Sequence, residues 1–306
     1  MLDFTVVTPT YNRANVLHRV YDSLSAQTYR NFEWIVVDDG SSDDTAQIVA
    51  EWQKEADFPI SYFYQENSGK HMALNLAGEK ANGRFFVIAD SDDSFRAEAL
   101  EILLTHWNNI PAEEQSDFRG VTCRCYDAET GAALGQGFPG GVHDVLGIDA
   151  SFKLRYHFEM WGFNRTDVIR EYPFPDTRGQ GLSFYPETVI WNRMGLKYRV
   201  RFVNAPLRCY YRDQGNAATK FTRNRSRENI HLWEHYVNDM LGYFRYEPMK
   251  FIKAFVGLSM DGLQLGKSAK EIVGIPNTVF GKIMTVLFFP AGFALYMKRR
   301  TKNKNL

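Results

Sequence analysis

Three carboxylates follow a strongly apolar run in the first third of the chain. Residues 84–95 read RFFVIADSDDSF, so Asp90, Asp92 and Asp93 come directly after five apolar residues. Such a run predicts a buried strand of a parallel sheet. Clustered carboxylates repel one another, and they lose solvation on burial unless a positive charge shares the site. These acids therefore either lie in a solvated loop or hold a cation.

The elements that must position these acids alternate in a simple way. Apolar runs predict strands at residues 4–8, 32–39, 60–65 and 85–89, and helical patterns occupy residues 14–27, 41–56 and 69–81. Ser42 or Asp43 is the expected N-cap of the second helix. Strands and helices alternating at this spacing predict parallel βαβ units covered by helices, so the predicted fold class is α/β.

The segments that follow the four predicted strands are all polar. They read TPTYNR, DDGSSDD, QENSGKH and DSDD. In sheets of this kind, ligands bind beyond the carboxyl ends of the strands. The four segments therefore predict one binding site at one edge of the sheet.

The side chains at this edge suit a nucleotide diphosphate. Tyr11 could stack on a base, and Asp39 could accept hydrogen bonds from a base imide. Asp90 could accept from ribose hydroxyls, while Asp92 could hold a divalent cation against the pyrophosphate, because hard cations take carboxylate oxygens as ligands. Lys70 adds a mobile positive charge.

The segments VVTPTYNR, WIVVDDGSSDDT, NSGKHMALN and IADSDD, in this order, resemble the family 2 glycosyltransferases, which have the GT-A fold. The resemblance is clear over residues 3–105 and can be followed to about residue 215. It implies a Rossmann-like, mostly parallel central sheet with helices on both faces. It also implies inverting transfer of a sugar from a nucleotide-sugar, usually UDP-linked, with Mn²⁺ or Mg²⁺.

The resemblance also implies roles for individual residues. The residues implied to bind the nucleotide-sugar are Pro9, Tyr11, Arg13, Asp39, Lys70, Asp90 and Ser91. Asp92, together with Asp90, is implied to bind the metal through the Asp-x-Asp pattern. Asp93 is either a second metal contact or the cap of a helix that begins near Arg96.

The general base is where this sequence departs from the family pattern. The family commonly carries a Glu-Asp pair at the acceptor end, whereas here Glu187 is followed by Thr188, which cannot act as a base. Glu187 is the predicted catalytic base because it opens a helix that is expected to face the same cleft. Asp176, in FPDTRGQG, is the second candidate. Arg212, in a Tyr-Arg pair like the one in the family's acceptor half, is a candidate phosphate contact.

Each motif also has a simpler interpretation. Tyr11 could pack in the core, Lys70 and His71 could form a solvated helical turn, and Glu187 could be an ordinary helix N-terminal acid. The alternative function is a nucleotide-sugar-binding protein without efficient turnover. A nicotinamide-dependent oxidoreductase is disfavoured, because TPTYNR stands where a Gly-x-Gly-x-x-Gly turn would be.

Three parts are expected along the chain. Residues 1–117 form the nucleotide-sugar-binding half of the predicted domain, residues 118–224 the acceptor-binding half, and residues 225–306 a helical C-terminal extension. Within the second part, residues 198–212 predict pairs of strands.

The last segment of the chain is apolar and then basic. Residues 283–297 carry no charge, but this run is too short to span a bilayer. With its basic neighbours, the segment 280–306 suits the surface of an anionic membrane. A core helix followed by a solvated basic tail is the alternative.

Composition limits the class of protein. The chain has 306 residues, 24% charged residues and a formal net charge of zero, which gives no indication of a disordered chain or of a nucleic-acid binder with a global basic field. The N-terminus lacks the pattern of a secretory signal, so we expect a cytoplasmic protein, peripheral on the inner face of the cell membrane. Its expected partners are a nucleotide-sugar donor and a glycan or lipid-linked acceptor.

The cysteines and one histidine pair are expected to be structural. Cys123, Cys125 and Cys209 are too few and odd in number for a disulfide scaffold, so buried free thiols in a reducing compartment are expected. His231 and His235 stand four residues apart on a predicted helix. Without a glutamate placed as in metalloproteases, this pair predicts packing or surface histidines rather than a metal site.

Overall fold

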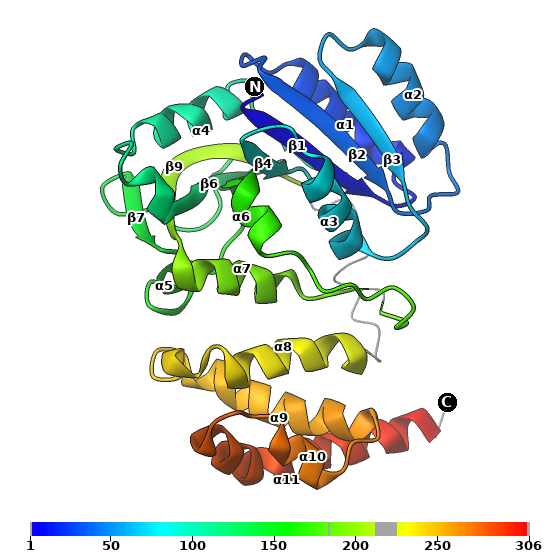
Figure 1. The fold of residues 1–306 in the computed structure, drawn as a ribbon, viewed down its shortest axis with the longest axis vertical. Coiled ribbons are helices and arrows are strands. Elements are labelled where there is room, and N and C mark those ends of the chain that lie inside the picture. Colours follow the sequence, from blue (N-terminus) through cyan, green and yellow to red (C-terminus); the bar gives the residue numbers. More distant parts are fainter. Residues whose placement is uncertain (1, 183, 212–224, 305–306) are drawn as a thin grey trace. The chain divides into compact units, whose positions relative to one another are not determined.

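A computed structural model describes residues 2–182, 184–211 and 225–304, which fall into two compact units (Figure 1). The first unit comprises Met1–Gly181 and Met194–Lys220. The second unit comprises Leu182–Arg193 and Phe221–Leu306. The predicted halves 1–117 and 118–224 contribute strands to one sheet in the first unit, and the ligand that each half binds remains a prediction.

The first unit is built on a nine-stranded sheet in the order β3-β2-β1-β4-β8-β6-β9-β5, with β7 paired to β9. The strands are β1 Phe4–Thr10, β2 Phe32–Asp38, β3 Ile60–Tyr64, β4 Phe85–Ile88, β5 Ser94–Phe95, β6 Phe118–Asp127, β7 Val142–Leu146, β8 Met160–Arg165 and β9 Arg199–Tyr210. As predicted, the first four strands are parallel to one another. β8 then runs antiparallel between β4 and β6.

Both faces of the central strands are covered. Every residue of β1 and β2 is buried, which explains why apolar residues occupy both faces of these strands instead of alternating with polar ones. The polar residues among them find partners inside the sheet. Thr5 Oγ1 donates to Glu33 Oε1 at 2.6 Å, and Trp34 Nε1 donates to Thr8 Oγ1 at 2.9 Å. These strands are therefore a rigid support for the loops at their carboxyl ends.

The first three helices of the first unit lie close to the predicted positions, and three further helices follow. They are α1 Ala14–Ser25, α2 Thr45–Glu55, α3 Lys70–Lys80, α4 Ala99–Asn108, α5 Gly147–Phe152 and α6 Thr166–Glu171, with a short 3-10 helix, η1, at Gln115–Asp117. α2 begins later than predicted and its N-cap is Asp44. Asp43 nevertheless contributes to this end of α2, because its Oδ1 accepts from the backbone N–H of Thr45 at 3.2 Å.

The prediction of strand pairs over residues 198–212 was wrong. β9 is one strand of 12 residues that pairs in parallel with β6. The register of this pairing shifts between Val203 and Pro206, so the two residues between them have no partner in β6. The Asn-Ala-Pro segment, which reads as a turn, is thus a bulge within one strand. Asn204 fixes it by accepting from Phe138 N at 2.6 Å and donating to Phe138 O at 2.9 Å.

The second unit is helical, as predicted for residues 225–300. Its helices are α8 Ser226–Asn238, η2 Leu241–Tyr243, α9 Pro248–Gln264, α10 Ala269–Gly274 and α11 Val279–Lys304, and α7 Glu187–Lys197 begins in it. Asp261 of α9 is fully buried and joins three helices. It accepts from Ser226 Oγ at 2.6 Å, Trp233 Nε1 at 2.8 Å and Arg299 Nη1 at 3.1 Å.

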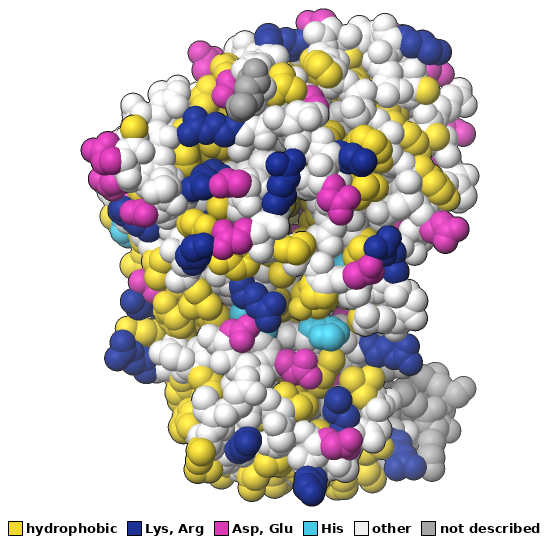
Figure 2. All heavy atoms as spheres, viewed as in Figure 1, with side chains coloured by type: hydrophobic (Ala, Val, Ile, Leu, Met, Phe, Trp, Pro, Cys, Tyr) yellow, Lys and Arg dark blue, Asp and Glu magenta, His cyan; other side chains and the backbone are white. Residues whose placement is uncertain are grey.

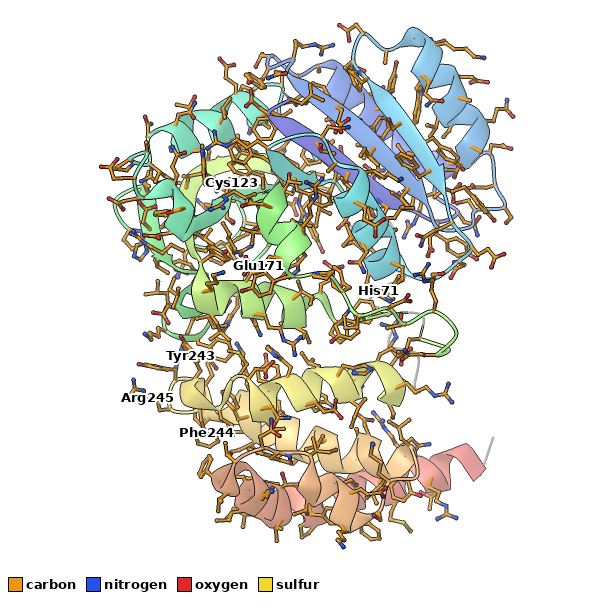
Figure 3. All side chains as sticks on the ribbon, in the orientation of Figure 1. His71, Cys123, Glu171, Tyr243, Phe244 and Arg245 are labelled. Carbon is orange, nitrogen blue, oxygen red and sulfur yellow. The ribbon has the colours of Figure 1, made fainter. Side chains whose placement is uncertain are left out.

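The predictions for cysteine and histidine are confirmed. The three cysteines are free and buried (Cys123 is labelled in Figure 3). His235 is buried between Asp239 and Asn192, at 2.9 Å and 3.2 Å. His231 packs against the ring of Tyr185, with 5.2 Å between ring centroids. Among the described residues, no group of three or more His, Cys, Asp or Glu side chains could hold a metal ion.

Gly120 of β6 provides a test of how closely β6 and β8 approach. A Cβ at this position would overlap the backbone of Phe163. We therefore expect Gly120→Ala to lower the free energy of unfolding by about 3 kcal/mol, as measured by urea denaturation. The control is Gly137→Ala, whose Cβ would make only ordinary contact with Asn204 and should change stability by less than about 1 kcal/mol. Equal effects of the two substitutions would contradict the close approach.

Candidate functional site

The loops after β1 and β2 are tied together by hydrogen bonds. Asn12 N donates to Ser41 Oγ at 2.8 Å, and Ser42 N donates to Asn12 Oδ1 at 2.8 Å. Asn12 has a φ of 51°, in the left-handed region that asparagine tolerates better than most residues. Ala14 N also donates to Asp43 Oδ2 at 2.9 Å. The two loops thus form one platform at the edge of the sheet.

Three predicted donor-binding residues lie on or beside this platform. Tyr11 is 49% exposed, so the interpretation of this ring as core packing is wrong. Pro9 is buried within β1, opposite Val37 of β2. Arg13 is half-buried at the N-cap of α1. Of these three side chains, that of Tyr11 is the most accessible to a ligand.

Asp39 is buried and holds the loop that leads into α3. Its Oδ1 accepts from Gln65 Nε2 and Ser68 N, both at 2.7 Å, and its Oδ2 accepts from Gly69 N at 2.8 Å. A carboxylate offers about four acceptor positions, so one remains for a ligand. The interpretation of residues 39–41 as a structural turn is thus partly right, and the contact of Asp39 with a base stays a prediction.

Lys70 and Asp90 come together although they are 20 positions apart in the chain. Lys70 Nζ lies 2.6 Å from Asp90 Oδ1, and the two side chains are 34% and 40% exposed. Burial raises the pKa of Asp90, but the charge and hydrogen bond of Lys70 and the charge of Arg208 outweigh it and hold the pKa below its usual range. Asp90 is therefore ionised at neutral pH.

Asp92 differs from its two acidic neighbours. Its side chain is half-buried, and it makes no hydrogen bond or ion pair within the part of the chain that the structure describes. Ser91, beside it, is also half-buried. Asp92 is the member of the acidic run that has a carboxylate still available for a ligand.

These residues fit a divalent cation only if a ligand helps to hold it. Asp92 offers one available carboxylate, while Asp90 already pairs with Lys70. Mg²⁺ and similar hard cations are commonly held by one or two carboxylates together with substrate phosphates and water, rather than by a complete protein cage. The donor set is suited to a cation that arrives with a diphosphate.

Asp93 is held by residues that the sequence did not point to. Its Oδ2 accepts from Asp90 N at 3.1 Å and lies 3.3 Å from Arg208 Nη1 of β9. Arg208 is 7% exposed, and its Nη2 also lies 2.9 Å from Glu159 Oε2. Burial raises the pKa of Asp93 to about 7, although the charge of Arg208 acts to lower it.

These contacts contradict one of the two interpretations of Asp93, the helix cap, while its contact with a metal stays a prediction. It does not cap the helix near Arg96, because α4 begins at Ala99 and its N-cap is Glu98. Instead, its carboxylate closes the turn that begins at Asp90. No sequence signal links Arg208 to this turn, because β9 enters the sheet more than a hundred residues later.

His71 corrects the interpretation of a solvated helical turn. It is 1% exposed, and its Nε2 lies 2.5 Å from Thr177 Oγ1 (Figure 3). One turn further along α3, Asn75 donates to Phe174 O at 2.8 Å and accepts from Phe174 N at 2.9 Å. α3 thus anchors the segment 174–177, which belongs to the same unit.

The two candidate bases lie in different surroundings. Asp176 is exposed and pairs with Arg178 at 2.6 Å, and the hydrogen bonds from Arg178 lower the pKa of Asp176 to about 2. Glu187 is half-buried at the first residue of α7, in the second compact unit. Its role as the catalytic base stays a prediction, as does that of Arg212, which lies outside the described residues.

The part of the chain that forms this edge of the sheet matches a known protein family. Residues 5–113 match the family model described as glycosyl transferase family 2. These residues belong to that family. The matched region contains β1 to β4 and every polar segment at their carboxyl ends.

Curated relatives match over the same region. The chain is 39% identical over 100 residues to an uncharacterized glycosyltransferase of Rickettsia conorii, covering 33% of this chain and 16% of that protein. It is 39% identical over 99 residues to the glycosyltransferase GlyA of Streptococcus pneumoniae, covering 32% and 14%. It is 34% identical over 103 residues to the poly(ribitol-phosphate) beta-N-acetylglucosaminyltransferase TarS of Staphylococcus aureus, covering 33% and 18%. The chain thus spans less than a fifth of the length of these relatives.

Solved structures extend the similarity of fold to nearly the whole chain. The crystal structure of residues 1–349 of S. aureus TarS aligns with a TM-score of 0.61 at 16% identity, over 97% of this chain and 92% of that one. The same TarS fragment in complex with UDP-GlcNAc gives a TM-score of 0.61 at 18% identity, with the same coverage. The fold is therefore GT-A with a C-terminal helical extension, as predicted.

The buried position of His71 predicts an acid-sensitive fold. Burial lowers the pKa of His71, although Asp39 and Asp176 act to raise it. The unfolded chain then binds a proton that the folded chain does not, so the free energy of unfolding should fall as the pH drops below about 6.5. Each unit of pKa difference corresponds to about 1.4 kcal/mol.

The measurement is chemical denaturation of wild type and His71→Gln between pH 5 and pH 8. The substitution should remove the contribution of His71 and leave two others in the profile. His106 and His235, whose pKa values are also lowered by burial, act in the same direction as His71, and Asp93, whose pKa burial raises to about 7, acts in the opposite direction. His18→Gln, at an exposed position of α1, is the control and should leave the profile unchanged. A wild-type slope that survives in His71→Gln would contradict the prediction.

Proposed function

We propose that this chain is an inverting, metal-dependent glycosyltransferase. It transfers a sugar from a nucleotide-sugar, UDP-linked, to a glycan or lipid-linked acceptor in the synthesis of cell-surface polysaccharide. One observation carries the proposal. A family 2 domain brings an exposed ring, Tyr11, to the edge of the sheet where Lys70 neutralises Asp90 and Asp92 keeps an available carboxylate.

The donor would bind through the platform and the acidic turn. Tyr11 stacks on the base, and Asp39 accepts a hydrogen bond from the base through its remaining acceptor position. Asp90 accepts from the ribose hydroxyls. The backbone of β1 around Pro9, the N-cap residue Arg13 of α1 and the half-buried Ser91 complete the surroundings of the nucleotide.

Lys70 is the mobile part of this site. Its ion pair with Asp90 joins two partly exposed side chains, and pairs of this kind contribute about 1 kcal/mol or less to stability. The lysine can therefore exchange Asp90 for a phosphate oxygen at little cost when a diphosphate arrives. That exchange frees Asp90 at the moment when a cation and the donor enter together.

Asp92, with Asp90 once it is released, would hold Mn²⁺ or Mg²⁺. The cation supplies positive charge where negative charge develops on the departing diphosphate. Asp93 stays out of this contact because its carboxylate is engaged with the backbone of Asp90 and with Arg208. The turn itself is thereby kept in one conformation while its outer carboxylates change partners.

Inversion requires a base for the acceptor hydroxyl on the face opposite the leaving diphosphate. We propose Glu187 for this role. Asp176 is a poor alternative, because its low pKa and its pairing with Arg178 make it a weak base at neutral pH. Thr188, which stands where the family commonly has aspartate, favours the second candidate function, a protein that binds nucleotide-sugar without efficient turnover.

The relatives guide the choice of donor and location. TarS is described as a beta-N-acetylglucosaminyltransferase, and its fragment has been crystallised with UDP-GlcNAc. We therefore propose a UDP-linked hexose or N-acetylhexosamine as the first donors to test. We also place the protein in the cytoplasm, peripheral on the inner face of the cell membrane, where lipid-linked acceptors are found.

The donor site is tested by calorimetric titration of UDP with and without Mn²⁺. Wild type should bind UDP more tightly with the metal, and Asp92→Asn should lose at least about tenfold of that affinity, equal to about 1.4 kcal/mol. Asp57→Asn, at an exposed position, is the matched control. Binding that needs neither the metal nor Asp92 would make the acidic run a capped loop and overturn the proposed site.

The base is tested by transfer and donor-hydrolysis assays with UDP-sugars. Glu187→Gln should reduce turnover by about a hundredfold or more, because a general base contributes at least that much, while UDP affinity stays at the wild-type value. Thr188→Ala and Asp176→Asn should keep most of the activity. Full activity of Glu187→Gln would exclude this residue as the base. Tight donor binding by a wild type that neither transfers nor hydrolyses sugar would favour the second candidate function.

A further inference from the structure

α11 carries most of its large apolar side chains on the outside of the second unit. Eight of them are exposed: Val279, Phe280, Ile283, Val286, Leu287, Phe293, Leu295 and Met297. Together they are called the outer face of α11. The residues of α11 that are buried are small, namely Gly281, Thr285 and Gly292. This is the reverse of a helix on the surface of a water-soluble bundle, whose large apolar residues face inward.

The small residues allow a close approach to the rest of the bundle. A Cβ at Gly292 would overlap Ser259 and the backbone of Val256 in α9. Thr285 donates its hydroxyl to Gly281 O at 2.8 Å, so its polar group is satisfied within the helix. Contact through glycine and small hydroxyl residues, with large apolar side chains left outside, is typical of helices surrounded by lipid.

The outer face is not part of the core formed by the described residues. The stretch Val279–Thr301 is 23 residues long with a mean hydropathy of 1.6, yet only 17% of its apolar window is buried. By length and composition it could cross a membrane, so the expectation that the segment is too short to span, which rested on residues 283–297 alone, was wrong. In Figure 2, hydrophobic side chains reach the surface along the lower margin of the second unit.

Charge at the two ends of the outer face is of one sign. Lys282 lies near one end of it, between Phe280 and Ile283. Lys298, Arg299 and Arg300 follow it at the other end, and residues 279–304 include no Asp or Glu. Lys282 and Lys298 are exposed. A basic residue near an anionic lipid surface contributes about 1 kcal/mol to binding. The pattern of an apolar face with basic ends complements phospholipid head groups above an acyl layer.

We propose that the outer face of α11 lies in the surface of an anionic lipid bilayer, with the helix parallel to the membrane and its inner face still packed on α9. The proposal concerns the second unit alone. It does not depend on the proposed transfer reaction, and a protein that fails to bind lipid could still bind UDP and transfer sugar.

The contacts of α11 favour this arrangement over a spanning helix. Arg299 of α11 donates to the buried carboxylate of Asp261 at 3.1 Å, and Phe288 stacks on Phe255 of α9 with 6.4 Å between centroids. Pulling α11 away to cross a bilayer would break both contacts. Lys282 and Lys298 are also separated by about 24 Å along the helix, less than the ~30 Å of a hydrocarbon core.

The same charges disfavour a dimer in which a second copy of this chain covers the outer face of α11. A symmetric dimer through the outer face would place two sets of basic residues beside one face-to-face contact. Without an acidic residue in residues 279–304, that contact offers no opposite charge to pair with them. An anionic lipid surface supplies that charge.

The test is co-sedimentation of the full chain with vesicles of phosphatidylcholine alone or mixed with phosphatidylglycerol. Wild type should pellet with the mixed vesicles and much less with phosphatidylcholine. The double substitution Val286→Glu and Leu287→Glu should reduce the partition coefficient at least tenfold. Lys298→Gln should reduce it about fivefold on mixed vesicles only. Leu196→Glu, at an exposed position of α7 in the first unit, is the matched control and should bind as wild type does.

Circular dichroism and thermal melting check that the variants fold, which is expected because the substituted side chains are exposed. Wild type that stays in solution with mixed vesicles, or equal binding of the double variant, overturns the proposal. Light scattering that shows a dimer, made monomeric by the double substitution without any vesicle binding, assigns the outer face to a second copy instead. A spanning helix would make vesicle-bound protein resistant to carbonate extraction and would protect residues beyond 301 inside the vesicles. That result would also overturn the proposal.

Discussion

Negative charge at the carboxyl end of β4 has to be compensated within the protein, and two cations from distant parts of the chain compensate it. Lys70, at the start of α3, pairs with Asp90 where both side chains are partly exposed. Arg208 of β9 pairs with Asp93 where both are buried. Buried carboxylates are costly unless such partners are present. The acidic turn is therefore possible only because β9 lies beside it.

The two ion pairs differ in a way that suits two tasks. The buried pair of Arg208 and Asp93 fixes the backbone, since Asp93 also accepts from the N–H of Asp90. The exposed pair of Lys70 and Asp90 can be exchanged for a ligand, because water screens it and each partner can be resolvated. A rigid turn with a replaceable counter-charge is what a metal-assisted diphosphate site requires.

The second unit follows a different physical rule from the first. In the first unit, large apolar side chains pack against both faces of the sheet, and its central strands are fully buried. In the second, Asp261 provides a buried polar centre for α8, α9 and α11, and glycines let α11 approach α9 closely. The large side chains of α11 are thereby left outside. A helix with that arrangement is stable beside lipid, because its exposed apolar area is then removed from water.

The sequence by itself determined the parallel βαβ half of the fold, its polar edge and the acidic run, because these depend on local periodicity and on the end at which each strand stops. It also determined that the cysteines would be buried. Only the tertiary structure decided that β9 is one strand with a bulge at residues 204–205, and that His71 is buried against Thr177. It alone brought Arg208 to Asp93 and Lys70 to Asp90, and it alone turned the large side chains of α11 outward. Each of these depends on contacts between residues far apart in the chain, and no local pattern of residue types encodes which distant strand, segment or helix will lie alongside.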